Sequence, residues 1–204
     1  MPQSVIRRLT RYLAHVQTLC AQEIKWVSSQ EIADDLGLTS STVRQDLSHL
    51  DFSGVSKRGY ETCGLEKVLT EILGADTKWK MVVVGAGNLG KALALHEEFS
   101  RRGFRIVGIF DADANKIGKK VGNLVIRSQK EIPALVSSEK VDIGIIAVPA
   151  QVAQSVADLL IMSGVKGLLN LALSHIVTPQ SVPVVDSRVV SSLLELSHTI
   201  KFGR

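Results

Sequence analysis

Apolar residues recur at helical spacing through the first third of the chain. Between residues 4 and 23 they return every three or four positions, which predicts an amphipathic helix. Residues 27–50 predict a helix, a turn and a second helix, and residues 68–73 predict another short helix. Residues 57–65 are rich in turn formers, and residues 74–77 are typical of a linker. This part of the chain therefore predicts a small helical domain.

The pattern changes from Trp79 onward, where continuous apolar runs alternate with helical segments. Such alternation is typical of a parallel sheet that helices cover on both faces. Helices are predicted to begin near Asn88, Ser128 and Gln151. The expected strands are residues 81–84, 105–110, 124–126, 141–148 and 167–170.

The C-terminal segment predicts a short strand followed by a helix. Four apolar residues share one stripe of this helix, and two more flank it, which makes the stripe wide for a terminal helix. The four are Val189, Leu193, Leu196 and Ile200, and the flanking pair is Val190 and Leu194.

Composition is that of a folded soluble protein, with 45% hydrophobic and 22% charged residues in 204. No apolar run reaches the roughly 18 residues that span a bilayer, and the N-terminus lacks the apolar core of a signal peptide. We therefore expect a cytoplasmic protein with no membrane partner. The net charge is +4, but the basic surplus lies after residue 75. A DNA-binding role must consequently be argued from individual charges rather than from the total.

The two cysteines, Cys20 and Cys63, belong to no Cys-x-x-Cys pair, so the sequence carries no zinc or dithiol signature and no metal is expected. Cys20 is expected to be a buried helix residue and Cys63 a loop thiol. A thiol switch at Cys63 alone has no support in the sequence.

A helix-turn-helix is predicted in residues 28–50. Ser28 and Glu31 stand at the spacing of a capping box, and Gly37 can adopt the left-handed conformation that ends a helix. Ser40 or Ser41 is expected to cap a second helix that runs to about Leu50.

The outward face of that second helix carries side chains suited to DNA. Arginine can bind guanine through two hydrogen bonds, glutamine suits adenine, and short hydroxyls suit phosphates. A basic pair between glycines, followed by an aromatic residue, then fits the wing of a winged helix. An alternative is a helical docking domain without DNA function. The predicted DNA contacts are Ser41, Thr42, Arg44, Gln45, Ser48 and His49 in the helix, with Lys57, Arg58 and Tyr60 in the wing.

A dinucleotide-binding loop is predicted directly after the first strand of the sheet. The sequence Gly-Ala-Gly-Asn-Leu-Gly at 85–90 is the G-x-G-x-x-G pattern, in which the glycines permit a tight turn, close approach of a pyrophosphate and helix packing. Asp111 directly follows the next predicted strand, where a carboxylate is expected to hold the adenosine ribose and repel a 2′-phosphate, so NAD(H) is favoured over NADP(H). Lys116, Lys119 and Lys120 weaken that preference, although a solvated cluster is the simpler interpretation. The predicted cofactor residues are Gly85, Ala86, Gly87, Asn88, Leu89, Gly90, Asp111, Ala112, Lys116, Val148, Pro149 and Asn170.

Other interpretations of the sheet remain open, including a Rossmann fold that binds coenzyme A or nothing. A small NAD-dependent oxidoreductase is a further alternative. Only 34 residues follow Asn170, too few for a usual substrate domain. His175 is the best candidate base, and no carboxylate stands at an obvious spacing from it. We therefore expect no enzyme activity and no catalytic residue.

Taken together, these motifs predict an α/β protein. We expect a winged-helix DNA-binding domain at residues 1–76, a Rossmann-like NAD(H)-binding domain with a parallel sheet at 77–180, and a C-terminal strand and helix at 181–204.

The order and spacing of these motifs resemble the Rex family of redox-sensing repressors. The resemblance covers nearly the whole chain and rests on residues 8–12, 42–48, 57–60, 85–90, 110–111, 116–118, 148–150 and 167–170. It implies a homodimer that binds double-stranded operator DNA, with NAD⁺ favouring the DNA-bound form and NADH releasing it. It also implies that the C-terminal helix is exchanged between subunits, and the wide apolar stripe fits that role. Packing of this helix on its own sheet is the alternative.

Three positions depart from the family pattern. Leu171 replaces a usual phenylalanine, His96 replaces a common tyrosine, and Arg188 stands where the family has an acidic residue, with Asp186 two positions earlier. In the family, an arginine of the first helix, Arg8 here, interacts during switching with the residues at the positions of His96 and Arg188. Arg8 would therefore oppose Arg188, and a DNA-binding paralogue with a lost or altered redox response is a further alternative.

Overall fold

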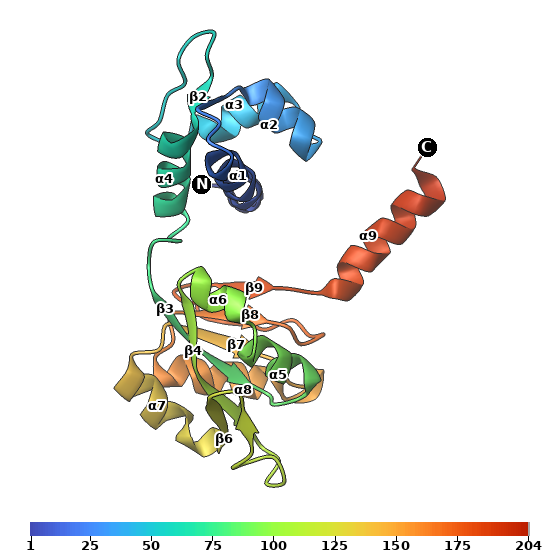
Figure 1. Ribbon diagram of the computed structural model, residues 1–204. Coiled ribbons are helices and arrows are strands. Elements are labelled where there is room, and N and C mark those ends of the chain that lie inside the picture. Colours follow the sequence, from blue (N-terminus) through green and yellow to red (C-terminus); the bar gives the residue numbers. More distant parts are fainter. Residues whose placement is uncertain (204) are drawn as a thin grey trace. The chain divides into compact units, whose positions relative to one another are not determined.

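The computed structural model describes residues 1–203 and divides into two compact units, Met1–Thr77 and Lys78–Arg204 (Figure 1). Within the described residues, no helix is long and apolar enough to cross a membrane. Each unit has its own hydrophobic core.

The first unit is a winged helix. It has four helices, α1 (Gln3–Ala21), α2 (Ser29–Leu36), α3 (Ser40–Leu47) and α4 (Thr62–Ile72), and a two-stranded ribbon whose strands lie between α1 and α2 and between α3 and α4. The ribbon pairs β1 (Trp26–Val27) with β2 (Tyr60–Glu61) in antiparallel register. The apolar faces of all four helices meet in one core that buries Leu9, Ile32, Val43, Leu65 and Leu69.

Four local predictions for this unit were wrong. Thr39, not Ser40 or Ser41, caps α3, because its hydroxyl accepts the Thr42 amide at 3.2 Å, and the helix ends at Leu47 instead of Leu50. The helix predicted at residues 68–73 begins six residues earlier, so Cys63 lies in its first turn rather than in a loop. The Glu61 carboxylate caps α4 by accepting a hydrogen bond from the Gly64 amide. The residues around it have low helix propensity, so the sequence pattern did not mark the start of this helix.

The second unit is a Rossmann fold. Its seven-stranded sheet has the order β5-β6-β4-β3-β7-β8-β9, parallel except for the short edge strand β5. The strands are β3 (Trp79–Val84), β4 (Phe104–Asp111), β5 (Lys120–Val121), β6 (Leu124–Ser128), β7 (Ile143–Ile146), β8 (Gly167–Asn170) and β9 (Val184–Asp186). From β3 the chain first adds β4, β5 and β6 on one side, and then returns to add β7, β8 and β9 on the other side. Such folds bind nucleotides where the strand order changes side, which is here between β3 and β7.

Helices cover the two faces of this sheet unequally. On one face, α7 (Ile132–Glu139) and α8 (Ala150–Ser163) bury Val82, Val84 and Ile146. On the other, the short helices α5 (Asn88–Ala94) and α6 (Glu97–Arg101) pack on part of the surface around Met81 and Val83. The rest of that face is an apolar hollow of about 630 Å³ lined by side chains that include Trp79, Phe104, Ile143, Leu169 and Val185.

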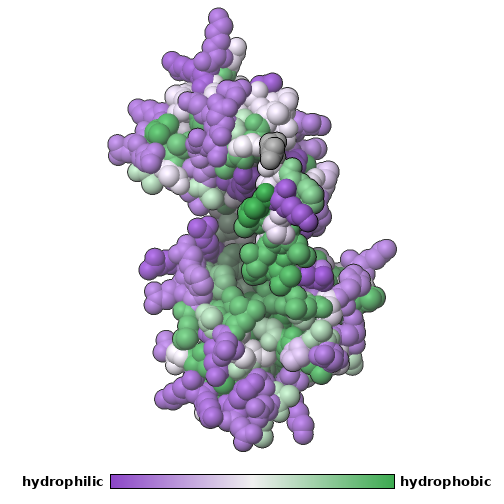
Figure 2. Space-filling model, turned by 90° about the vertical axis from the view of Figure 1, so that its right-hand side faces the viewer, coloured by the Kyte–Doolittle hydropathy of each residue, from purple (hydrophilic) through white to green (hydrophobic). Residues whose placement is uncertain are grey.

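The C-terminal helix α9 (Val189–Phe202) buries none of its residues. Side chains of its apolar stripe are more than half exposed, with Val189 and Ile200 at 75%. The alternative that α9 packs on its own sheet is therefore contradicted for this chain taken alone. Figure 2 shows hydrophobic side chains gathered on one face of the sheet unit, in the lower half of the view.

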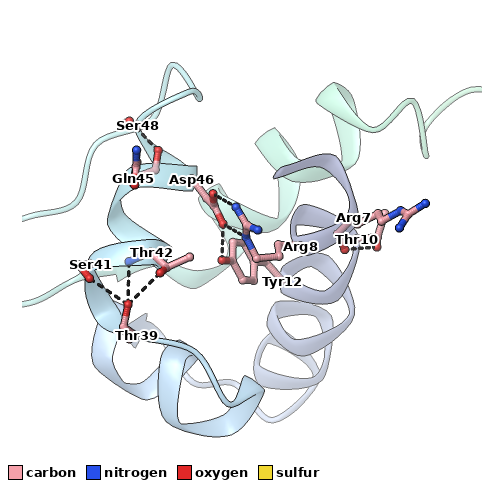
Figure 3. A network of polar contacts seen from close by, with 10 residues as sticks. All are labelled: Arg7, Arg8, Thr10, Tyr12, Thr39, Ser41, Thr42, Gln45, Asp46 and Ser48. Atoms are coloured by element: carbon pink, nitrogen blue, oxygen red, sulfur yellow. Dashed lines mark hydrogen bonds and ion pairs between the residues drawn. The ribbon is translucent and has the colours of Figure 1, made fainter. Parts of the chain in front are cut away.

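A buried carboxylate joins α1 to α3 in the winged-helix unit (Figure 3). The Asp46 side chain accepts Arg8 Nε at 2.6 Å, Arg8 Nη2 at 2.7 Å and the Tyr12 hydroxyl at 2.6 Å. Burial alone opposes the charged form, but these hydrogen bonds outweigh it and lower the pKa of Asp46. The ion pair thus fixes the orientation of α3, with one side toward the core and the other toward solvent.

We expect Asp46→Asn to lower the free energy of unfolding of this unit by about 2–3 kcal/mol, because an amide cannot accept all three donors. Urea unfolding followed by Trp26 fluorescence, in a Trp79→Phe background, measures the change. Asp51→Asn, at an exposed carboxylate, is the matched control.

The same experiment has a defined pH dependence. Because the folded-state pKa of Asp46 lies below the ordinary 3.8, its contribution is present above that pH and disappears as pH falls through the folded-state pKa. The difference between the parent protein and Asp46→Asn should therefore be constant near neutrality and shrink below about pH 4. A difference that grows on acidification would contradict the ion pair.

Candidate functional site

The helix-turn-helix residues predicted to contact DNA lie on the exposed face of α3 and directly after its end, since Ser48 and His49 follow its last residue. Ser41, Arg44, Gln45, Ser48 and His49 are exposed, whereas Thr42 is half-buried and bonds to Thr39. A helix of this composition, with one face free, suits insertion into the major groove.

The turn before α3 is set by local chemistry. Ser28 and Glu31 form the predicted capping box at the start of α2, and Gly37 adopts the left-handed conformation with φ 65° at its end. Arg44 Nη1 donates to Ser29 Oγ at 3.2 Å, so this arginine lies beside the start of α2. A guanidinium at this position can leave a single surface hydroxyl for a base edge or phosphate at small cost.

The wing is a tight hairpin in which Val55 pairs with Gly59. Gly59 has φ 90°, and a Cβ there would lie 2.3 Å from the Val27 carbonyl oxygen, so no other residue fits. Lys57 and Arg58 are exposed at its tip, and the Arg58 guanidinium lies 5.5 Å from the centre of the Trp26 ring. Trp26, which sequence reasoning did not single out, thus steadies a wing arginine.

Tyr60 has a structural role in the wing. Its ring stacks with Phe52 at a centroid distance of 6.5 Å and is half-buried. Its predicted contact with DNA remains a prediction.

The glycine-rich loop between β3 and α5 divides its glycines by role. A Cβ at Gly85 would lie 2.2 Å from the Ala147 carbonyl oxygen, and one at Gly90 would lie 1.9 Å from the Gly85 carbonyl oxygen. Both glycines are therefore required for packing. A Cβ at Gly87 would meet no atom within 4 Å, and Gly87, Asn88 and Leu89 are exposed. The loop thus presents bare backbone and the start of α5 to solvent, which is what a pyrophosphate requires.

Asp111 lies beside this loop with its carboxylate partly committed. Its Oδ2 accepts the Ala86 amide at 2.8 Å and Lys116 Nζ at 3.0 Å, and its Oδ1 accepts the Asp113 amide at 2.9 Å. Burial opposes its charged form, but the Asp113 amide, Lys116 and the Ala86 amide outweigh burial and lower its pKa. The side chain is therefore an anion that retains an acceptor position for a ribose hydroxyl.

Lys116 is not the solvated lysine that the sequence favoured, because its amine is ion-paired with Asp111. Lys119 and Lys120 are exposed, as is Ala112, which follows Asp111 directly. The positive charge of Lys116 thus stands at the point where a nucleotide's ribose would meet Asp111.

The other side of the loop is formed by the end of β7. Val148 is half-buried against Gly85, with its Cγ1 3.0 Å from the position of a Cβ on that glycine, and Pro149 precedes α8. Asn170, predicted to contact the nicotinamide, is fully buried and engaged within the protein. Its Nδ2 donates to the Ser174 carbonyl and to Asp186 Oδ1, and its Oδ1 accepts the Ala172 amide. Asn170 therefore joins β8 to β9 in this structure.

The predicted switch residues each have partners within their own unit. Arg8 pairs with Asp46, while Arg188 lies 3.3 Å from Asp186 Oδ2 and also donates to the Ser174 carbonyl. His96 is not inside a helix, because the helical structure is interrupted between α5 and α6 and His96 directly precedes α6. The centre of its ring lies 5.0 Å from that of Phe99. The two arginines are thus neutralised separately.

A winged helix with an exposed recognition face and a Rossmann sheet with an open glycine loop define a nucleotide-binding transcriptional regulator as the class of protein.

Comparison with known proteins agrees with this class. Residues 1–48 match the family described as "Putative DNA-binding protein N-terminus", and residues 76–174 match "CoA binding domain". The redox-sensing transcriptional repressor Rex of Caldicellulosiruptor saccharolyticus is 40% identical over 97% of this chain and 90% of its own. That of Carboxydothermus hydrogenoformans is 41% identical over 98% and 97%.

Solved structures give the same result. The crystal structure of the Rex-family repressor RSP with β-NAD⁺ and operator DNA has a TM-score of 0.93 and 32% identity, covering 98% of this chain and 93% of that one. RSP with β-NADH has a TM-score of 0.90 and 33% identity, covering 98% and 94%. This chain belongs to the Rex family of redox-sensing transcriptional repressors.

We expect Asp111→Ala to weaken NADH binding about tenfold or more, through loss of a charged hydrogen-bond acceptor for the ribose. The same change releases Lys116 from its ion pair, so binding of NADPH should weaken less or improve. Titration calorimetry with both nucleotides measures the ratio. Asp158→Ala, at an exposed carboxylate of α8, is the control. Equal affinities of the parent protein for NADH and NADPH would contradict the role of Asp111 at the ribose.

Proposed function

We propose that this protein is a homodimeric repressor that binds operator DNA through α3 and the wing and responds to the NADH/NAD⁺ ratio through the loop between β3 and α5. The observation that carries the proposal is the pairing, in one chain, of an exposed recognition helix with a backbone cradle open at Gly87. Its relatives carry the name of redox-sensing repressors, and RSP binds β-NAD⁺, operator DNA and β-NADH. Operator DNA as the partner implies a cytoplasmic location.

The site favours NAD(H) over coenzyme A. Coenzyme A carries a phosphate on the adenosine ribose, and the anionic Asp111 would repel it. The unmodified ribose of NAD(H) instead offers two hydroxyl donors to the carboxylate. When bound, the nicotinamide supplies the redox signal, since the oxidised ring is cationic and the reduced ring is neutral.

Residues of this chain would hold the cofactor at both ends. The exposed start of α5 would hold the pyrophosphate through its backbone amides, and Asp111 would accept hydrogen bonds from the ribose. Val148 and Pro149, at the end of β7, would border the nicotinamide half. Asn170 supports this end of the sheet indirectly, by holding Asp186 on the neighbouring strand.

The exposed α9 and the uncovered sheet face support the homodimer. Monomeric proteins rarely expose contiguous apolar surface on this scale. An apolar helix without a partner and an apolar hollow of about 630 Å³ in the same unit are complementary in chemistry, and exchange of α9 between two chains would bury both. A second copy of the chain is therefore the partner that we propose.

The response to nucleotide then follows from two arrangements of this dimer. Only one arrangement would space the recognition helices to match two half-sites of an operator. NAD⁺ and NADH would shift the balance by their different affinities for the two arrangements, with NADH favouring release. Arg8 and Arg188 each have a carboxylate partner within their own unit, Asp46 and Asp186 respectively.

A paralogue with an altered redox response is the second candidate, and the substitutions His96, Leu171 and Arg188 favour it. An oxidoreductase has less support. Its candidate base, His175, is exposed, and within the described residues no salt bridge joins it to a carboxylate.

We expect NADH to release the protein from a labelled palindromic operator in the presence of NAD⁺, as measured by fluorescence anisotropy. Tight binding that ignores NADH would favour the paralogue, and absence of specific binding would contradict the repressor.

Arg44→Ala should weaken operator binding about tenfold or more, because a bidentate contact to guanine is lost. Lys130→Ala, in the sheet unit, should leave it unchanged.

We expect Leu193→Glu to convert the dimer to monomer in sedimentation experiments, because burying a charge within the exchanged helix interface is costly. Ser191→Glu places the same charge on another side of α9 and should leave the dimer intact. A dimer that persists with Leu193→Glu would contradict the exchange.

A further inference from the structure

Two thiols far apart in the sequence meet in the winged-helix unit. Cys20 Sγ, near the end of α1, lies 3.0 Å from Cys63 Sγ, in the first turn of α4. Both cysteines are free thiols. Neither the dinucleotide site nor the recognition helix uses either of them.

The surroundings give the two thiols different roles. Cys63 is exposed and borders a surface hollow that Glu66 and Lys67 also line. It stands in the first turn of α4. Cys20 is half-buried, and burial, with contributions from Cys63 and Glu66, raises its pKa. Cys63 is therefore the thiol that a small oxidant reaches first. Cys20 lies beside it in the position of a resolving cysteine.

We infer that Cys20 and Cys63 form a peroxide-sensitive dithiol that closes to a disulfide within the DNA-binding unit. The Cys63 thiolate attacks one oxygen of hydrogen peroxide, so that an S–O bond forms, the O–O bond breaks, and the departing hydroxide takes a proton to become water. The Cys20 sulfur then attacks the Cys63 sulfur. The S–S bond forms, the S–O bond breaks, and the second hydroxide leaves as water with the proton of Cys20. Two thiols are oxidised and one peroxide is reduced to two waters.

The disulfide would connect α1 and α4, two helices that support the DNA-binding surface. Its Cys63 end lies three residues after Tyr60, where the wing enters α4. Its Cys20 end lies on α1, the helix whose Arg8 and Tyr12 hold Asp46 of α3. Because the sulfurs already touch in the folded unit, closure needs only a small movement. The bond therefore stabilises the unit and leaves its DNA-binding surface in place, while it prevents irreversible oxidation of Cys63.

The experiment uses the reduced full chain, treated with hydrogen peroxide at one to two equivalents. Thiol titration should fall from two to none per chain, and the intact mass should drop by about 2 Da. Peptide mapping without reductant should find Cys20 joined to Cys63, and dithiothreitol should reverse all three changes. The melting temperature of the winged-helix unit should rise by roughly 10 °C, as expected for a cross-link closing a long loop. Operator affinity should stay within about twofold.

Single variants separate this disulfide from simple oxidation. Cys63→Ser should leave one unreactive thiol, whereas Cys20→Ser should let Cys63 oxidise further, with a gain of about 32 Da. Retention of both thiols in the parent protein would overturn the inference. So would a disulfide between chains, or a gain of oxygen in place of the 2 Da loss. None of these readouts depends on the NADH response, so its failure and failure of the dithiol are distinguishable.

Discussion

The buried carboxylate of Asp46 is the constraint on which the DNA-binding unit depends. An anion at 2% exposure is unfavourable unless its acceptors are filled, and Arg8 and Tyr12 fill them from α1. Because Asp46 lies in the recognition helix, satisfying it also fixes which face of α3 points away from the core. Arg44, Gln45 and Ser48 are exposed as a consequence. One ion pair thus connects the stability of the unit to the orientation of the side chains that we predict to contact DNA.

The glycine loop after β3 is likewise shaped by a few close contacts. Gly85 and Gly90 are needed because neighbouring backbone leaves no room for a Cβ, and that crowding brings the start of α5 close to β3 and β7. Gly87 is free of such crowding and leaves the loop open. Asp111 uses the Ala86 amide to brace this loop while it keeps an acceptor position for a ribose. The same hydrogen bond therefore holds the glycine loop and orients the carboxylate that we predict to bind the ribose.

The exposed α9 connects these two units to an oligomeric function. Val189 and Ile200 are exposed at 75%, and α9 buries none of its residues within the described part of the chain. Burial of its apolar stripe against a second copy would make dimer geometry part of the folded state. A nucleotide that favours one dimer arrangement could then change operator binding without touching α3. The Cys20–Cys63 pair lies outside this coupling, since both thiols belong to the DNA-binding unit.

The sequence by itself determined the features that depend on neighbouring residues. The capping box at Ser28, the left-handed Gly37 and the glycine loop after β3 are short-range backbone requirements, and each was predictable from local spacing. Asp46 left one signal, a polar residue among the inward positions of its helix, but its partner Arg8 lies 38 residues away. The Cys20–Cys63 contact, 43 residues apart, left none. The tertiary structure alone decided these pairs, and the burial of Asn170, because they depend on how helices and strands pack after the local elements have formed.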